Sequence, residues 1–441
     1  MSDLFFENIG IKVPNILLPE KNVEYSNWSV VACDQYTAQP AYWEQVEKIV
    51  DMSPSTFRIT LPEIFLEEDD CDDRIKDINE IMQEYMDKNI LLDKGEGFVL
   101  VERKAHGRTR HGLVVALDLE KYDYSKGSTS LIRATEGTVL ERIPSRKKIR
   151  KNAVIETPHI MVLIDDPPES VIGELFTQIH NSTPLYDTKL MQGGGEIKGW
   201  LIDDRKKIIE IAKAIEKLPI NANMLYAVGD GNHSLASAKA HWEDVKVKLG
   251  DKWEHHPARF ALVELVNVHD KGLEFEPIHR VVFNCDYIDL LNKLEIFVKN
   301  KGGLIETKYF IGEVANKKMK AQWKKISTIS SGQKFYFVTN KVSGIVIMDG
   351  TGYTMTVATL QAFLDEYLLE HSESEVDYIH GANVVTEISS EPMNLGIVLP
   401  PMSKFDLFLA VINEGALPRK TFSMGEANEK RYYMECRKIV E

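Results

Sequence analysis

The hydrophobic positions along the chain follow two patterns, one typical of helices and one typical of strands. Apolar residues spaced three or four apart predict amphipathic helices over residues 41–50 and 72–89. Apolar or alternating stretches predict strands at 56–61, 97–103, 110–117, 158–164 and 259–268, the second and third joined as a hairpin. Beyond residue 287 the two patterns alternate, with helices over 287–299 and 357–371 and strands over 303–309, 334–340 and 344–349. This mixture predicts an α/β or α+β fold, in which helices flank a mixed sheet.

The length of 441 residues is enough for two or three domains. Changes in the rhythm of the pattern place boundaries near residues 170 and 300. We therefore expect an N-terminal mixed α/β part over 1–170, a central part over 171–300 and a C-terminal α/β part over 301–441.

One stretch of the central part, residues 223–234, combines a buried strand with a polar turn. The apolar run from Met224 to Val228 predicts a strand that is buried on both faces. Gly229 and Gly231 permit a tight turn and a close approach of a ligand to the backbone. The Ala-rich segment after the turn has a high helix propensity. The pattern thus places four polar residues where a strand leads into a helix: Asp230, Asn232, His233 and Ser234.

Open α/β sheets bind ligands at such junctions, where the first N–H groups of the helix face an anion. We predict that Asp230 and His233 are catalytic and that Asn232 and Ser234 bind the substrate or its phosphate. The alternative is an ordinary Asp-Gly turn with a satisfied histidine, since the stretch has no Gly-Lys-Ser/Thr phosphate loop.

Two further groups of polar residues complete the chemistry that phosphate transfer needs. Carboxylates bind Mg²⁺ or accept the proton of a hydroxyl group, and guanidinium groups hold phosphate oxygens. We predict Asp230 and Glu136 as catalytic groups and as Mg²⁺ ligands. The predicted substrate and phosphate ligands are Thr138, Arg142, Arg146, His279 and Arg280.

Each of these groups also has a structural interpretation. Glu136 can pair with a neighbouring arginine at the surface. The basic run over residues 146–150 can form a solvated helix face, the common position of a run of charges. His279 and Arg280 can stabilise the fold by pairing with nearby acids.

The composition and charge of the chain argue against several classes of protein. The formal net charge of −14 argues against nucleic-acid binding, whose affinity comes mostly from the neutralisation of phosphates by Lys and Arg. The apolar runs are shorter than a membrane span, and the N-terminus shows no signal-peptide pattern. The cysteines are scattered and form no Cys-x-x-Cys pair, which favours a reducing compartment. We expect a cytoplasmic protein with no membrane association and leave its oligomeric state open.

The order of the motifs resembles the domain of unknown function 1015 family over nearly the whole chain. The family's His-Glu-x-Thr, Asp-Gly-His-His-Arg and Pro-Thr-His-Arg motifs correspond here to residues 135–138, 230–234 and 277–280. The chain departs from them at Thr135, Asn232 and Ser234. The turn is also similar to that of ParB/sulfiredoxin-like proteins, which include nucleotide-dependent free serine kinases.

The resemblance implies a nucleotide-binding core of the ParB/sulfiredoxin type that uses ATP or ADP with Mg²⁺. Our leading hypothesis is a small-molecule kinase that transfers phosphate to a hydroxyl group, with free serine as one acceptor. The substituted turn motivates an alternative, a non-catalytic regulator that senses a nucleotide or a metabolite. A third hypothesis, DNA binding in the manner of partition proteins, is disfavoured by the net charge.

Overall fold

The protein divides into two compact units. The computed structural model describes residues 4–37, 39–125, 127–138, 140, 143–312, 314–329, 332–418 and 420–441. The first unit consists of the chain up to Glu274 together with residues 424–441, and the second unit consists of Phe275–Ser423. The second unit is therefore an insertion in the sequence of the first.

The predicted boundaries near residues 170 and 300 differ from this division. Strands β5 (Phe98–Ala105) and β12 (Glu196–Ile202) lie on either side of residue 170 in sequence, yet they pair directly. Residue 300 ends helix α8 (Tyr287–Asn300), which packs into the core of the second unit. Long-range pairing, which the local pattern does not contain, keeps both predicted boundaries inside a unit.

The described part of the first unit contains an 11-stranded mixed sheet with the main order β11-β12-β5-β6-β14-β10-β13-β8-β7, to which β2 and β1 add beside β6. Its other strands are β1 (Phe5–Phe6), β2 (Ile11–Lys12), β6 (Arg108–Asp118), β7 (Tyr122–Asp123), β8 (Ile132–Ala134), β10 (Met161–Ile164), β11 (Tyr186–Lys189), β13 (Tyr226–Asp230) and β14 (Phe260–Asn267). Two small antiparallel pairs accompany it, namely β3 (Asn15–Pro19) with β4 (Leu91–Glu96) and β9 (Ile155–Glu156) with β22 (Arg437–Lys438).

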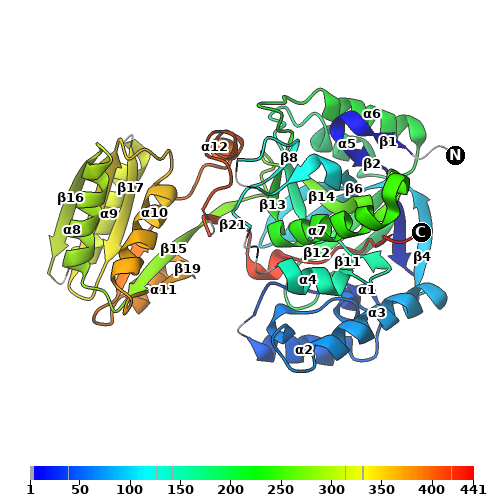
Figure 1. Ribbon diagram of the computed structural model, residues 1–441, viewed down its shortest axis with the longest axis horizontal. Helices are drawn as coiled ribbons and strands as arrows, with labels where there is room; N and C mark the ends of the chain where they lie inside the picture. The colour runs from blue at the N-terminus through cyan, green and yellow to red at the C-terminus, as the bar shows by residue number, and fades with distance from the viewer. Residues whose placement is uncertain are drawn as a thin grey trace. The chain divides into compact units, whose positions relative to one another are not determined.

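The helices of the first unit lie around this sheet (Figure 1). They are α1 (Tyr25–Trp28), α2 (Pro40–Val50), α3 (Cys71–Asp87), α4 (Ile143–Arg150), α5 (Ile172–Ile179), α6 (Arg205–Glu216) and α7 (Asn232–Leu249). Ile172, Ile211 and Leu235 from α5, α6 and α7 belong to one hydrophobic core. Ile75 and Met82 from α3 belong to a second core, in which residues of the C-terminal segment also take part.

The described part of the second unit contains a 7-stranded sheet with the order β16-β18-β17-β20-β15-β19 and β21 beside β15. Its strands are β15 (Phe275–Phe283), β16 (Leu304–Ile311), β17 (Gln333–Val338), β18 (Val342–Asp349), β19 (Glu375–His380), β20 (Leu395–Val398) and β21 (Phe422–Met424). Its other helices are α9 (Ala315–Ile329), α10 (Thr356–Glu370), α11 (Ala382–Ile388) and α12 (Leu407–Glu414).

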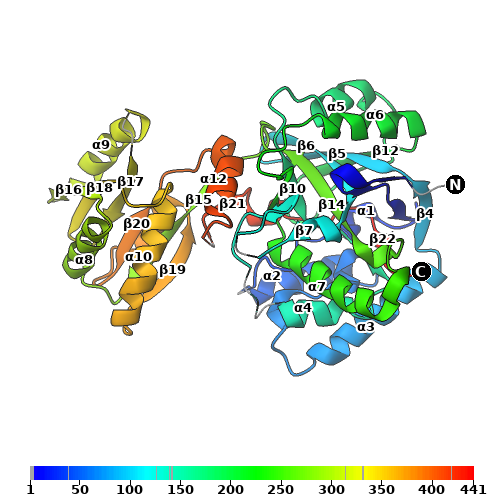
Figure 2. The ribbon, with the colours of Figure 1, turned by 45° about the horizontal axis from the view of Figure 1, so that its top comes forward.

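Both faces of the second sheet are covered. Leu294 of α8 and Leu360 of α10 pack into one core, and Met319 of α9 and Val385 of α11 pack into another. Figure 2 shows α8 and α10 on the face of the sheet opposite α9. Because alternate residues of a strand point to opposite faces, strands covered on both sides contain continuous apolar runs, such as residues 335–338 of β17 and 345–348 of β18.

The predicted fold class, a mixed sheet with flanking helices, is confirmed. The helices expected at 41–50, 72–89, 287–299 and 357–371 are present as α2, α3, α8 and α10, and the hairpin is present as β5 and β6. The strand predicted over 56–61 is wrong, since Thr56–Arg58 form a 3-10 turn. There the hydroxyl groups of Ser55 and Thr56 donate to the Trp28 carbonyl. Such side-chain bonds to the backbone compete with strand pairing.

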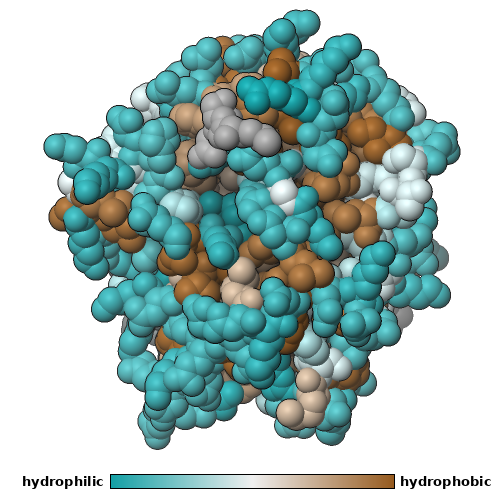
Figure 3. Space-filling view, turned by 90° about the vertical axis from the view of Figure 1, so that its right-hand side faces the viewer, coloured by the Kyte–Doolittle hydropathy of each residue, from teal (hydrophilic) through white to brown (hydrophobic). Residues whose placement is uncertain are grey.

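The exposed surface is mainly hydrophilic, as the composition of the chain leads us to expect. The face in Figure 3 is covered mainly by hydrophilic residues, with hydrophobic residues in smaller areas between them. Within the described residues, every helix is too short or too polar to traverse a lipid bilayer.

Candidate functional site

Two parallel strands bring the predicted carboxylates to one edge of the first sheet. Strands β8 and β13 run in parallel, with Ala134 opposite Val228. Glu136 follows the end of β8, and Asp230 is the last residue of β13. The Thr135 hydroxyl donates to the Val228 carbonyl at 2.6 Å and fixes the two strand ends to each other. The predicted pair of carboxylates therefore lies at one edge of one sheet.

A neighbouring strand adds a histidine that the sequence pattern did not single out. Strand β10 runs antiparallel to β13, with Met161 opposite Asp230, so the residues that precede β10 lie at the same edge. One of them is His159, whose Nε2 lies 2.9 Å from the Ser234 hydroxyl. Burial lowers the pKa of His159 and outweighs the opposite effect of the carboxylates of Asp34 and Asp230. The imidazole is therefore neutral near pH 7.

The turn between β13 and α7 leaves the first turn of the helix open to an anion. Gly231 is the N-cap of α7 in the left-handed conformation, with φ 79°, and provides no side-chain cap. A Cβ at Gly231 would lie 3.0 Å from Cγ1 of Ile160, so a side chain would be crowded as well as strained. Asn232 and Ser234 lie inside the helix. The first N–H groups of a helix lack acceptors within it and attract negative charge.

Asn232 presents an acceptor to the same place. Its side chain is buried and its Nδ2 donates to the Val228 carbonyl at 3.4 Å. Its Oδ1 is buried and has no hydrogen-bond partner within the described residues. A buried polar atom without a partner is uncommon and costs free energy. The Asn232 carboxamide oxygen can thus accept a hydrogen bond from a donor that the described residues do not supply.

The C-terminal segment adds a lysine between the carboxylates. Nζ of Lys430 lies 3.2 Å from Oδ2 of Asp230, and the two side chains are 18% and 21% exposed. Burial lowers the pKa of Lys430, but the charges of Asp230, Asp34 and Glu136 outweigh burial and raise it. A single ammonium group thus faces three carboxylates that come from three different parts of the chain.

Asp34 reaches the site through backbone pairing with that same segment. The N–H of Ala32 donates to the Lys430 carbonyl at 2.7 Å, and Val31 forms a bridge with Arg431. Burial raises the pKa of Asp34, but the charge of His159, which is protonated at the low pH where Asp34 titrates, and the charge of Lys430 outweigh burial, so the pKa of Asp34 lies below its ordinary value. Asp34 is therefore ionised at neutral pH.

One wall of the site combines an aromatic ring, a thiol and an ion pair. The Tyr432 ring meets the His159 ring edge-on, with centroids 4.9 Å apart. Burial raises the pKa of the Cys33 thiol to about 12, so the thiol is neutral beside Asp34. Arg146 of α4 forms an ion pair with Glu63, and its charge acts on both Cys33 and His159.

The other residues of the first unit that were predicted as part of the site lie in different environments. Thr138 lies after Glu136, and its buried hydroxyl has no hydrogen-bond partner within the described residues. His233 lies half-buried in the first turn of α7, where its carbonyl accepts from the Ser237 hydroxyl. Arg142 lies outside the described residues. The basic run is not a uniformly solvated face, because Arg150 pairs with buried Glu156.

His279 and Arg280 lie in the second unit, within strand β15 and not at its end. The Arg280 side chain is fully buried, donates to the Ile278 carbonyl and to Oε1 of Gln361, and lies over the Tyr378 ring. The Leu399 N–H donates to Nδ1 of His279 at 3.3 Å. Burial, followed by the charges of Arg280 and His380, lowers the pKa of His279 to about 4. These contacts are to main-chain and amide groups and not to the acids that the structural interpretation named, and the phosphate-binding role of the two residues stays a prediction.

The carboxylates offer only part of a metal site. Within the described residues, no three His, Cys, Asp or Glu side chains are grouped to hold a metal ion. Protein sites commonly bind Mg²⁺ through one or two carboxylates, with water and substrate phosphates as the other ligands. Asp230 and Glu136 fit that pattern, and their role as Mg²⁺ ligands remains a proposal.

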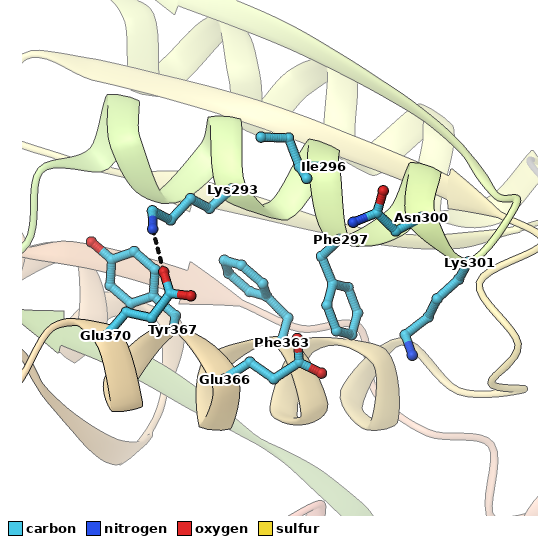
Figure 4. A pocket seen from close by; sticks show the side chains of 9 residues that line it. All are labelled: Lys293, Ile296, Phe297, Asn300, Lys301, Phe363, Glu366, Tyr367 and Glu370. Atoms are coloured by element: carbon cyan, nitrogen blue, oxygen red, sulfur yellow. Dashed lines mark hydrogen bonds and ion pairs between the residues drawn. The ribbon is translucent and has the colours of Figure 1, made fainter.

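A separate cavity of about 430 Å³ lies in the second unit between α8 and α10 (Figure 4). Phe297 and Phe363 point toward each other in it, and Lys293 pairs with Glu370 at one end. Asn300, Lys301 and Glu366 line the other part. None of the residues predicted as a site lies there.

Comparison with known proteins agrees with the resemblance seen in the sequence. A family model described as "Protein of unknown function (DUF1015)" matches residues 17–367. Comparison with curated proteins gives no match.

Three of the solved structures to which the chain is similar are the following. A conserved hypothetical protein from Pyrococcus furiosus is 13% identical, with 74% of this chain and 95% of that chain covered and a TM-score of 0.36. A free serine kinase in complex with AMP is 14% identical, with 71% and 88% covered and a TM-score of 0.36. A variant of free serine kinase in complex with ADP is 12% identical, with 71% and 88% covered and a TM-score of 0.37.

Proposed function

The chain belongs to the family described as "Protein of unknown function (DUF1015)", and we propose that it is a cytoplasmic, nucleotide-dependent small-molecule kinase. It transfers phosphate from ATP or ADP to the hydroxyl group of a small acceptor, for which free serine is one candidate. The observation that supports this proposal is the position of Lys430 among Asp34, Glu136 and Asp230, beside the uncapped first turn of α7.

The site contains positive groups that suit phosphate oxygens and carboxylates that suit a cation. The first turn of α7 and the Lys430 ammonium group can hold phosphate oxygens, as can the Arg146 guanidinium beside them. The carboxylates outnumber the ammonium group, so the site favours a complementary cation. A Mg²⁺ ion carried in with the nucleotide, or the ammonium group of an amino-acid acceptor, would supply that charge.

Proton transfer in this proposal belongs to the carboxylates. The acceptor hydroxyl must lose a proton as its oxygen attacks the phosphorus, and an ionised carboxylate can take that proton. Asp34, whose pKa is lowered by His159 and Lys430, and Asp230 are the candidates for this role. Neutral His159 and the Ser234 hydroxyl would orient the acceptor through hydrogen bonds.

Calorimetric titration with ATP and ADP, each with and without Mg²⁺, tests the proposal first. Phosphate-transfer assays on a panel of amino acids and sugars then identify the acceptor. We expect Asp230→Asn and Glu136→Gln to abolish transfer while the exposed control Asp251→Asn leaves it unchanged. Absence of nucleotide binding by the wild-type protein, or full activity of both site variants, would reject the proposal.

The cavity in the second unit supports a second candidate function, a regulator that senses a metabolite. Its volume of about 430 Å³ lies within the usual range of small-molecule sites, and it combines an aromatic floor with charged ends. In that case a metabolite panel should raise the melting temperature with no turnover, and Lys301→Ala with Glu366→Ala should remove the shift. If the protein transfers phosphate and the double variant leaves the melting-temperature shift unchanged, the kinase is favoured.

A further inference from the structure

Strand β16 presents an open edge of the second sheet. It is the first strand in the sheet order and pairs on one side with β18 in continuous register from Leu304 opposite Asp349 to Ile311 opposite Val342. Within the described residues no strand lies on its other side, and Figure 1 draws it at one edge of the sheet. Such an edge carries a row of main-chain donors and acceptors that another strand can use.

The exposed side chains of β16 combine large apolar residues with one acid and one base of opposite charge, Glu306 and Lys308. Leu304 and Ile311 are each 76% exposed and Tyr309 is 50% exposed. The strand contains no proline and its register shows no bulge. Proteins commonly protect exposed edges with short strands, bulges, proline or uncompensated charges.

The opposite edge of the same sheet shows what protection looks like. Strand β19 places Glu375 and Asp377 on its exposed positions and contains no lysine or arginine. Two copies of β19 centred on Asp377 would bring like charges together, which destabilises pairing. Strands β16 and β19 are thus the two edges of one sheet, and they differ in the charges that their exposed positions carry.

The sequence of β16 is complementary to itself in one antiparallel register. Opposed residues of an antiparallel pair both turn their main-chain groups toward the partner or both turn them away. A two-fold axis that relates two copies of one strand must therefore pass between two equivalent residues, one from each copy. An axis at Thr307 places Glu306 opposite Lys308 twice, Ile305 opposite Tyr309, and Leu304 opposite Phe310.

The adjacent registers lack this complementarity. An axis at Glu306 would oppose two glutamates, and an axis at Lys308 would oppose two lysines. Like charges directly opposite each other weaken a strand pair, whereas opposite charges and Thr–Thr pairs stabilise it. The charges thus select the register centred on Thr307.

We propose that β16 is a dimerisation edge, at which two copies of the chain pair their β16 strands antiparallel about a two-fold axis at Thr307. The pairing joins two 7-stranded sheets into one continuous sheet. The interface is isologous, since each copy contributes the same residues, and such an interface closes after two subunits. This inference does not depend on the proposed kinase activity.

Analytical ultracentrifugation of the full-length chain and of charge variants tests the proposal. We expect a dimer for the wild type and at least about tenfold weaker association for Glu306→Lys and for Lys308→Glu, since each variant opposes like charges twice. The double variant Glu306→Lys with Lys308→Glu restores opposite charges in the same register and should restore the dimer. Asp377→Lys on β19 is the matched control and should leave association unchanged.

Thr307→Cys provides a second measurement that does not depend on affinity. In the proposed register the two introduced thiols face each other across the axis and should form an intersubunit disulfide on mild oxidation. A wild-type monomer at all concentrations would overturn the proposal. A dimer that is insensitive to both single variants, or one that the double variant fails to restore, would overturn it equally.

Discussion

The β13–α7 turn of the first unit and the His279–Arg280 pair of the second contain similar residue types, yet their environments are opposite. The turn lies at a strand end, where Asp230 and Lys430 are partly exposed and several carboxylates face one ammonium group. His279 and Arg280 lie inside a strand, are buried, and bond to main-chain and amide groups of their own unit. The comparison shows that position along the strand separates a candidate site from a structural pair.

The largest effect should come from Arg280→Ala. This change leaves a cavity in the second unit and removes the hydrogen bonds to Ile278 and Gln361. We expect the free energy of unfolding to fall by about 4 kcal/mol, measured by urea denaturation. Lys341→Ala in an exposed turn of the same unit is the control. A stable Arg280→Ala variant that had lost nucleotide binding would reverse the comparison.

The pH dependence of stability should follow His279. Its pKa is about 4 in the folded state, below the ordinary value of 6.5, so the folded protein keeps this imidazole neutral. The contribution to stability is complete above about pH 6.5, is lost as the pH falls toward 4, and amounts to about 3 kcal/mol. Urea denaturation at pH 7 and pH 4.5 should show a smaller loss for His279→Gln than for the wild type. The exposed control His255→Gln should match the wild type.

Replacement of the site lysine should affect binding more than stability. Lys430→Met removes the ammonium group that compensates Asp230, Asp34 and Glu136. We expect nucleotide affinity to fall about 100-fold, or about 2.7 kcal/mol, in calorimetric titration. Lys438→Met, an exposed change in the same C-terminal segment, should bind nucleotide like the wild type. Equal affinities for the two variants would remove Lys430 from the site.

The smallest effect should come from Gly231→Ala. Its φ of 79° is unfavourable for alanine, and the new methyl group would press on Ile160. We expect a loss of about 1–2 kcal/mol in the free energy of unfolding. Gly107→Ala is a matched control, because Gly107 has φ 75° but no neighbour within 4 Å of a Cβ. A larger loss for Gly107→Ala than for Gly231→Ala would show that the contact with Ile160 has no cost.

Local sequence patterns predicted the elements better than they predicted the site. Periodicity located α2, α3, α8, α10 and the β5–β6 hairpin, because a repeat of apolar positions depends on near neighbours only. The strand–turn–helix order likewise located Asp230 and the open N-terminus of α7. The same reasoning misplaced the domain boundaries, because a sheet joins strands that are distant in sequence.

The residues that sequence reasoning missed, Asp34, His159 and Lys430, reach the site by long-range pairing. His159 had a usable signal, since it lies near the start of the strand predicted over 158–164 and an antiparallel neighbour would place it beside the end of β13. Lys430 had none, because it lies in a segment without periodicity and is positioned by backbone bonds to residues 30–32. The burial of His279 and Arg280 was not predictable, because the sequence does not show whether polar groups are satisfied internally.

The insertion of the second unit has a consequence for synthesis of the protein on the ribosome. The sheet of the first unit is complete before residue 275 is made, but Lys430 and the β22 strand that pairs with β9 follow the whole inserted unit. Nascent chains therefore carry Asp34, Glu136 and Asp230 without Lys430 until the whole inserted unit has been translated. A prematurely terminated product would have most of the fold and an incomplete site, and would expose the surfaces that residues 424–441 normally cover.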